Sequence, residues 1–152
     1  MAYQLSQRSL DRLKGVDDRL IKVVKRAIEL SPIDFMVLEG VRSKEQCMIN
    51  YGKGRTASQC AAKGVPTKYA NPSAAKVTWL NNPFASKHTV GKAVDLVPYP
   101  VDWNDLKKFD LIAQAMLQAA KELGVPVRWG ADWDNDGKPR ERGESDSPHF
   151  EI

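Results

Sequence analysis

The chain has 152 residues, of which 42% are hydrophobic and 28% are charged, and its formal net charge is +4. This length and composition fit one globular domain, so we expect residues 1–152 to fold as a single domain with a substantial core. No apolar run approaches the roughly 18–20 residues of a membrane span, and residues 1–6 lack the basic head and apolar stretch of a secretory signal.

The first part of the chain predicts a helix, a strand and the start of a second helix. Pro32 would end the first helix, and residues 33–41 are rich in apolar residues, which is typical of a strand. Ser43 and Gln46 have the spacing of a capping box, so a second helix is predicted toward Tyr51. The apolar stripe of the first helix recurs at steps of three and four residues: Val16, Leu20, Val23, Ala27 and Leu30.

The middle of the chain predicts a long loop followed by a strand. Residues 52–84 have glycines or prolines near both ends and only short Ala-rich pieces, so we expect a loop, and excursions of this length often line a binding cleft. Residues 92–97 form the next predicted strand. Because side chains alternate along a strand, Asp95 lies on the opposite face from Val94 and Leu96.

The last third predicts one long helix and two short strands. The helix spans residues 105–123, and Gly124 has the character of a helix-ending glycine. A short strand follows at 125–129, then a polar loop at 131–147, then a terminal strand at 148–152. Few strands, interspersed helices and no repeated βαβ units predict an α+β fold with a small antiparallel sheet and flanking helices. The apolar stripe of the helix predicted at 105–123 consists of Phe109, Ile112, Ala113, Met116, Ala120 and Leu123.

The clearest chemical signal comes from the two histidines of the chain, His88 and His149. Neutral imidazole is the commonest protein ligand for zinc, and a catalytic zinc site takes three protein ligands and a water. Asp95 would complete the three ligands. A water activated by zinc needs a nearby base, and Asp146 lies three positions before His149. The sequence therefore predicts a metallohydrolase, although His88 and Asp95 taken alone could be unrelated polar residues at the start of a strand.

These segments resemble a known family. Residues 86–95 read Ser-x-His-x-x-Gly-x-Ala-x-Asp, and an acid-x-x-His segment follows at 146–149. This pattern resembles the zinc D-Ala-D-Ala carboxypeptidase (VanY-like) and L-alanyl-D-glutamate endopeptidase superfamily. The variant here, with residues 93–98 reading Ala-Val-Asp-Leu-Val-Pro, is most similar to the phage endolysin branch. The resemblance runs from about Leu38 to the end, and it implies a hedgehog- or DD-peptidase-like fold and a Zn²⁺ cofactor.

The resemblance also implies roles for further residues. The family places its general base three positions before the last histidine, which favours Asp146 over the nearby Glu144. The segment at Arg42 resembles the family's Gly-x-Arg-Ser, whose arginine supports the substrate or the developing oxyanion; a strand-end arginine in a surface ion pair is the alternative. Ser86 matches the family serine that orients the site or the substrate. Glu151 would either support a ligand histidine or be an exposed strand residue.

A separate acidic loop suggests calcium. Asp132, Asp134 and Asp136, followed by Gly137, match the first positions of an EF-hand loop. The twelfth position would be Gly143 instead of the bidentate glutamate, and flanking helices are lacking, so the pattern does not predict a full EF-hand. Either a partial Ca²⁺ loop at the rim of the active site or a plain acidic turn fits the pattern.

Charge and cysteine content indicate which partners the chain could bind and whether it forms disulfides. Residues 1–76 carry 14 Lys and Arg against 7 Asp and Glu, while residues 77–152 carry 9 against 12. The basic half could attract anionic wall polymer or lipid head groups, or its charges could simply be solvated. We expect no nucleic-acid partner, because basic and aromatic residues do not alternate. Cys47 and Cys60 do not make a disulfide framework and are expected to be free thiols in a reducing cytoplasm. The alternative is that they are zinc ligands, but their spacing fits no common zinc motif.

The expected function is zinc-dependent hydrolysis of peptide bonds in bacterial peptidoglycan, as an L-alanyl-D-glutamate endopeptidase that serves a phage as endolysin. The resemblance implies that the chain is made in the host cytoplasm and acts on the wall after release. We expect a monomer with peptidoglycan as its partner. Two alternatives stay open: a D-Ala-D-Ala carboxypeptidase, and a non-catalytic zinc domain that binds wall peptide. Retention of Asp146 and Arg42 argues against the second.

Overall fold

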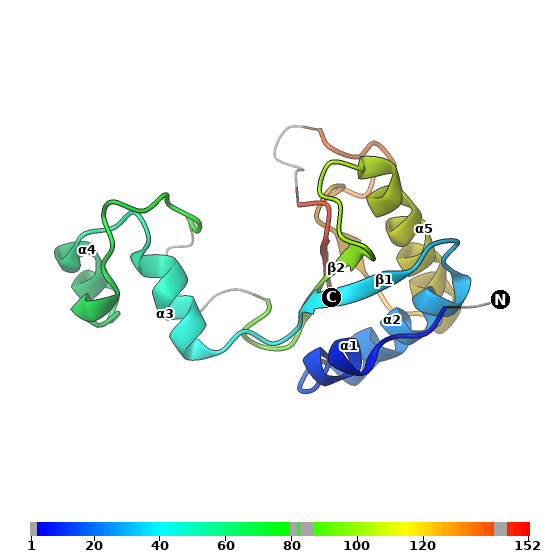
Figure 1. The fold of residues 1–152 in the computed structure, drawn as a ribbon, viewed down its shortest axis with the longest axis horizontal. Helices are drawn as coiled ribbons and strands as arrows, with labels where there is room; N and C mark the ends of the chain where they lie inside the picture. Colours follow the sequence, from blue (N-terminus) through cyan, green and yellow to red (C-terminus); the bar gives the residue numbers. More distant parts are fainter. Residues whose placement is uncertain (1–2, 80–81, 83–86, 142–145) are drawn as a thin grey trace. The chain divides into compact units, whose positions relative to one another are not determined.

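The computed structural model describes residues 3–79, 82, 87–141 and 146–152 (Figure 1). The chain divides into two compact units, one made of Met1–Val41 with Gly91–Ile152, the other of Arg42–Val90. The elements in chain order are α1 (Gln7–Arg12), α2 (Asp18–Leu30), β1 (Phe35–Glu39), α3 (Lys44–Gly52), α4 (Ala57–Ala62), the 3₁₀ helix η1 (Thr67–Tyr69), β2 (Ala93–Pro98), α5 (Leu106–Leu123), β3 (Arg128–Trp129) and β4 (His149–Glu151).

The first unit contains a four-stranded sheet in the order β1-β2-β4-β3, and every neighbouring pair is antiparallel. The predicted α+β fold with a small antiparallel sheet is therefore confirmed. β4, formed by the last residues of the chain, lies between β2 and β3. Because it pairs with β2, Val94 lies opposite Phe150 and Asp95 lies opposite His149.

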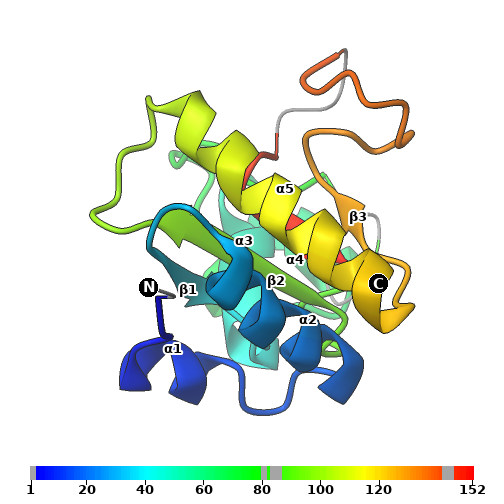
Figure 2. The ribbon, with the colours of Figure 1, turned by 90° about the vertical axis from the view of Figure 1, so that its right-hand side faces the viewer.

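Helices α2 and α5 cover one face of this sheet (Figure 2). The predicted stripe of α2 is buried at Leu20, Val23 and Ala27, and it packs in one core with Leu96 and Phe150, none of which is exposed. Alternation along β2 and β4 then turns Asp95 and His149 to the opposite face. The packing of α2 and α5 thus fixes which face of the sheet carries the polar residues.

Helix α1, which the sequence analysis did not predict, protects the edge strand β1. Ser6 caps it by accepting a hydrogen bond from the Ser9 amide. The Ser9 hydroxyl accepts a bond of 3.0 Å from the Val37 amide, and Arg12 donates one of 2.9 Å to the Val37 carbonyl. The amide and the carbonyl of Val37 are therefore both hydrogen-bonded to side chains of α1. At this position the edge strand β1 cannot pair with a further strand.

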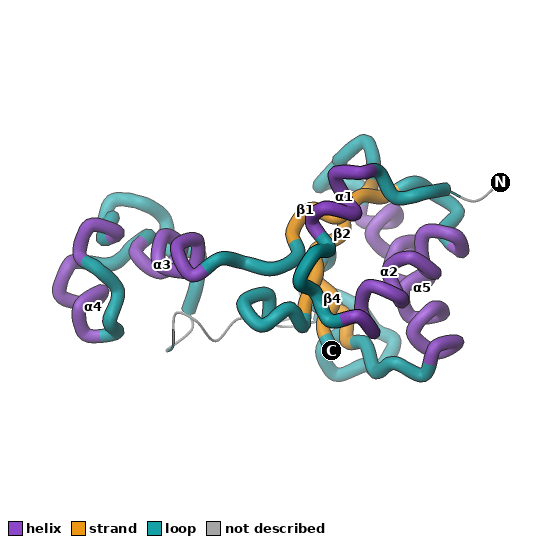
Figure 3. The backbone as a smooth tube through the Cα atoms, turned by 90° about the horizontal axis from the view of Figure 1, so that it is seen from below, coloured by secondary structure: helices purple, strands orange, loops and turns teal. Residues whose placement is uncertain are grey.

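The second unit corrects the prediction of a loop over residues 52–84. It contains α4 (Figure 3) and η1. It also has a small core of its own, formed by Tyr51, Cys60 and Val65. The signal for α4 was present in the sequence: Thr56 and Gln59 form a complete capping box. Predicted helix α3 is confirmed, with the Ser43 hydroxyl accepting from the Gln46 amide.

Of the remaining element boundaries, one agrees with the prediction and one differs from it. Helix α5 ends as expected at Gly124, which adopts the left-handed conformation with φ 68°. The strand predicted at 125–129 is paired only at Arg128 and Trp129, because β4 offers it only the partners Phe150 and Glu151. None of the helices described is long and apolar enough to span a membrane. The expectation of a single domain stays a prediction.

Candidate active site

The site is built on the pairing of β2 with β4. Asp95 and His149 are direct partners in this antiparallel pair, and neither side chain is more than 17% exposed. The His149 Nδ1 lies 3.4 Å from the Asp95 Oδ1. Two residues that are 54 positions apart in the sequence therefore place a nitrogen and an oxygen, both able to bind a metal, side by side on one face of the sheet.

His88, the third predicted ligand, lies in the turn that continues directly into β2, and it is only 2% exposed. One ligand atom from each of His88, Asp95 and His149 lies within 4.8 Å of the other two. Arg42 is close to His88, because the Arg42 amide donates a 3.0 Å hydrogen bond to the His88 carbonyl.

Asp146 lies beside Nδ1 of His149, the ring nitrogen that also faces Asp95. Its Oδ2 is 3.8 Å from the His149 Nδ1, and its side chain is 52% exposed. The two residues are the ends of a tight turn in which the His149 amide donates to the Asp146 carbonyl at 3.1 Å. Trp129 anchors this turn by donating from Nε1 to the Ser147 carbonyl at 2.7 Å. A solvent-accessible carboxylate is thus held next to Nδ1 of His149.

Gly130, which the sequence analysis did not single out, makes this arrangement sterically feasible. Its amide donates to the His149 carbonyl at 2.7 Å, and its carbonyl accepts from the Asp146 amide at 3.1 Å. A Cβ at this position would lie 2.4 Å from the Asp146 carbonyl oxygen and 3.0 Å from the His149 Cβ. Only glycine allows the backbone to approach so closely.

The other ring nitrogen of His149 faces Glu151. The His149 Nε2 lies 3.2 Å from the Glu151 Oε1, and the Glu151 Oε2 lies 3.6 Å from Arg128. Glu151 is only 8% exposed, so it is not the exposed strand residue that the sequence left as one alternative. Its carboxylate can accept a hydrogen bond from a protonated Nε2, which leaves the Nδ1 lone pair available to a metal.

The charges around His149 change its pKa. Burial alone would lower the pKa, but the nearby Asp95, Asp146 and Glu151 outweigh burial, so the pKa of His149 is raised above its ordinary value. The Trp133 ring lies 5.4 Å from the His149 imidazole, centroid to centroid, and limits the rotation of that imidazole. A ring surrounded by carboxylates is favourably placed to hold either a proton or a metal cation.

The residues fit zinc. Two imidazoles and a carboxylate are a common donor set for catalytic zinc. Two ligands that are each about 2.0–2.1 Å from a tetrahedral zinc lie about 3.3 Å from each other. The observed 3.4 Å between Nδ1 of His149 and Oδ1 of Asp95 matches that separation.

The acidic loop after β3 forms a second cluster of carboxylates. Carboxylate oxygens of Asp132, Asp134 and Asp136 lie within 4.8 Å of one another. Asp132 is 5% exposed and accepts bonds from the amides of Asp136 and Gly137, at 3.2 and 3.0 Å. Burial raises the pKa of Asp132, while the Lys138 amide lowers the pKa of Asp136. Both a cation loop and an acidic turn are compatible with these bonds.

Three further predictions have different outcomes. Ser86 and the alternative base Glu144 lie outside the described residues. Cys47 and Cys60 are buried free thiols, and Cys47 lies 3.2 Å from the Thr89 hydroxyl.

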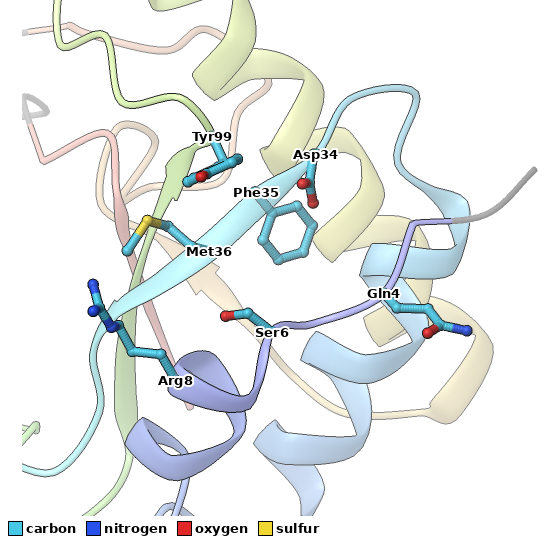
Figure 4. Close-up of a pocket in the computed structure, with 7 residues that line it drawn as sticks. All are labelled: Gln4, Ser6, Arg8, Asp34, Phe35, Met36 and Tyr99. Atoms are coloured by element: carbon cyan, nitrogen blue, oxygen red, sulfur yellow. The ribbon is translucent and has the colours of Figure 1, made fainter.

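A pocket of about 400 Å³ lies beside β1 (Figure 4), but it contains no predicted site residue. Its lining consists of Gln4, Ser6, Arg8, Asp34, Phe35, Met36 and Tyr99.

The chain matches a family of known peptidases. The family model described as phage L-alanyl-D-glutamate peptidase matches residues 1–71 and 62–152. The chain is 34% identical to the L-alanyl-D-glutamate peptidase of Escherichia phage T5, an alignment that covers 100% of this chain and 99% of that protein.

Two solved structures have a similar fold. The Serratia marcescens L-Ala D-Glu endopeptidase ChiX has a TM-score of 0.63 and 27% identity, over 100% of this chain and 91% of its own. The vancomycin-resistance D,D-pentapeptidase VanY, solved in complex with Zn(II), has a TM-score of 0.52 and 17% identity, over 100% and 78%. The predicted DD-peptidase-like fold and the predicted peptidase class are confirmed. The chain belongs to the phage L-alanyl-D-glutamate peptidase family.

Proposed function

We propose that the chain hydrolyses the bond between L-alanine and D-glutamate in the stem peptides of peptidoglycan and serves as a phage endolysin. The observation that carries this proposal is the full-length match to the phage T5 L-alanyl-D-glutamate peptidase, together with a ligand and base arrangement suited to peptide hydrolysis. ChiX, whose fold and sequence are also similar, is named for the same bond. The alternative of a D-Ala-D-Ala carboxypeptidase receives only a likeness of fold, from VanY.

The cofactor we propose is one Zn²⁺, held by His88, Asp95 and His149. The close approach of their ligand atoms supports this set, and so does the zinc in the related fold of VanY. When bound, zinc would act as a Lewis acid toward the scissile carbonyl and lower the pKa of a water to about 7.

The residues of the chain would supply proton transfer and orientation. Asp146 is exposed enough to reach substrate, and its carboxylate would take a proton from the attacking water and return it to the leaving amine. Glu151 would hold His149 in the tautomer that presents Nδ1. Arg42, near His88, would stabilise the negative charge that develops on the carbonyl oxygen, and Ser86 would orient the substrate.

The experiment is digestion of purified peptidoglycan followed by mass spectrometry of the soluble fragments. Cleavage at the proposed bond leaves a new amino terminus on D-glutamate and a new carboxyl terminus on L-alanine. The Asp146→Asn variant is the control for contaminating hydrolases. Release of free D-alanine alone would instead establish a carboxypeptidase, and intact wall after prolonged incubation would favour a non-catalytic zinc domain.

Calcium binding at Asp132, Asp134 and Asp136 stays a prediction, since none of the comparisons names calcium. A hard cation would relieve the repulsion among three carboxylates whose oxygens are so close. The test is the melting temperature with and without millimolar calcium, in wild type and in a triple Asp→Asn variant. Equal responses of the two proteins would establish an acidic turn.

We propose further that the chain acts as a single-domain monomer that is made in the host cytoplasm and reaches peptidoglycan after release. The relationship to a phage peptidase supports the wall as its target. Sedimentation equilibrium measures the oligomeric state, and a single cooperative unfolding transition is expected for a single domain.

A further inference from the structure

The positive charge of the chain is concentrated in the second unit. Residues 42–90 carry eight Lys and Arg and a single acid, Glu45, whereas the rest of the chain carries 15 basic and 18 acidic residues. The second unit therefore has a formal charge of +7 and the first unit a charge of −3. The structure shows that the excess belongs to one compact part with its own small core, instead of to the whole N-terminal half.

The basic side chains of this unit are mostly available to solvent. Lys44, Lys63, Lys68 and Lys76 are exposed, and among the described residues none of the four forms an ion pair. They are distributed over α3, the end of α4, η1 and the loop that follows. In the first unit many cations are already paired: Arg26 with Glu122, Lys92 with Asp17, and Arg140 with Asp110.

We propose that the second unit is a cationic docking surface for peptidoglycan, which it holds through the carboxylates of many stem peptides. The proposal rests on the proposed function, because that function makes this polyanion the substrate. A net formal charge of +7 attracts a polyanion over about 8–10 Å at physiological salt, and such fields raise association rates by about 10- to 1,000-fold. Multiple carboxylates on one polymer add avidity without any single tight contact.

A polymer fits this surface better than a lipid bilayer does. A helix that inserts into a bilayer interface buries an exposed apolar face there. In α3 and α4 the apolar residues Tyr51 and Cys60 are instead turned into the small core. Val77 and Trp79 are nevertheless exposed, so anionic lipid is the rival partner that the experiment must test.

The experiment compares two quadruple variants in an Asp146→Asn background, which is chosen to leave the polymer intact. One carries Lys→Gln at positions 44, 63, 68 and 76. Its matched control carries Lys→Gln at positions 22, 25, 107 and 121, four exposed lysines of the first unit. Both variants have the same net charge, so they differ only in where charge was removed. Binding to purified peptidoglycan is measured by co-sedimentation across a range of NaCl concentrations, and circular dichroism verifies folding.

We expect the second-unit variant to bind at least about tenfold more weakly at low salt and to lose most of the salt dependence, while the control changes little. Equal weakening of both variants, or undiminished binding by the first, would overturn the proposal. So would a second-unit variant that loses binding to phosphatidylglycerol vesicles but keeps binding to peptidoglycan. Hydrolysis by the unmodified chain is measured separately, so a protein that docks through these lysines without cutting would refute the proposed function alone.

Discussion

The His149 imidazole is held between two carboxylates, with Asp95 3.4 Å from Nδ1 and Glu151 3.2 Å from Nε2. Both arrangements follow from strand geometry. Asp95 is the cross-strand partner of His149, and Glu151 is two residues along the same strand, on the same face. One side of the ring is therefore placed for a metal and the other for a supporting hydrogen bond.

Replacing any proposed ligand should remove zinc. We expect about one zinc per wild-type chain, and greatly reduced zinc in His88→Ala, Asp95→Ala and His149→Ala, because each loses one of three protein ligands. Elemental analysis of the purified proteins measures this. Cys47→Ala is the control, since a thiol outside the group should not affect zinc. Full zinc occupancy in His149→Ala would refute the ligand set.

Asp146→Asn should keep zinc and fold but hydrolyse peptidoglycan about 10²- to 10⁴-fold more slowly, because the amide cannot accept a proton. The rate of fragment release, with zinc content measured alongside, tests this. Near wild-type turnover would assign the base to Glu144, and Glu144→Gln should then be the slow variant.

Glu151→Ala should weaken zinc affinity by about 10- to 100-fold, because the His149 Nε2 loses the acceptor that fixes the ring. Glu151→Gln keeps an acceptor oxygen and should restore most of the affinity. Competition with a zinc chelator measures both variants. Equal affinities in wild type and Glu151→Ala would show that Trp133 and the strand alone orient the ring.

Gly130→Ala should displace Asp146 and His149, since the added methyl would overlap the Asp146 carbonyl oxygen. We expect lower stability together with weaker zinc binding and slower hydrolysis. Gly52→Ala is a matched control: its Cβ would overlap the Tyr69 carbonyl oxygen, in the other unit. Both should lower the melting temperature, but only Gly130→Ala should alter zinc affinity. Identical zinc affinities would contradict the role assigned to Gly130.

Asp17 should make the stability of the folded protein depend on pH in the acid range. Hydrogen bonds from the Arg19 side chain, the Lys92 ammonium and the Arg19 amide hold the pKa of Asp17 well below its usual range. A depressed pKa in the folded state stabilises the protein above the ordinary value of 3.8, and this contribution is lost progressively as the pH falls toward the folded-state value. Asp17→Asn should therefore melt lower than wild type at pH 7, and the difference should shrink below about pH 4. A difference independent of pH would assign the effect to helix capping.

The sequence alone determined the features that depend on local spacing. The stripe of α2, the cap of α3 at Ser43 and the end of α5 at Gly124 follow from helical periodicity and capping chemistry, which need no distant partner. The α+β class and the alternation along β2 were predictable for the same reason. Helix α4 could also have been found, since Thr56 and Gln59 carry a complete capping box.

The tertiary structure decided what depends on contacts between distant segments. The sequence left Glu151 between two roles, because burial of a strand residue depends on which strands flank it, and β4 lies between β2 and β3. Gly130 carried no signal, since its need for hydrogen in place of a methyl arises from the approach of Asp146, 16 positions away. The compact basic unit was also hidden, because a sum of charges over half the chain does not show which residues fold together.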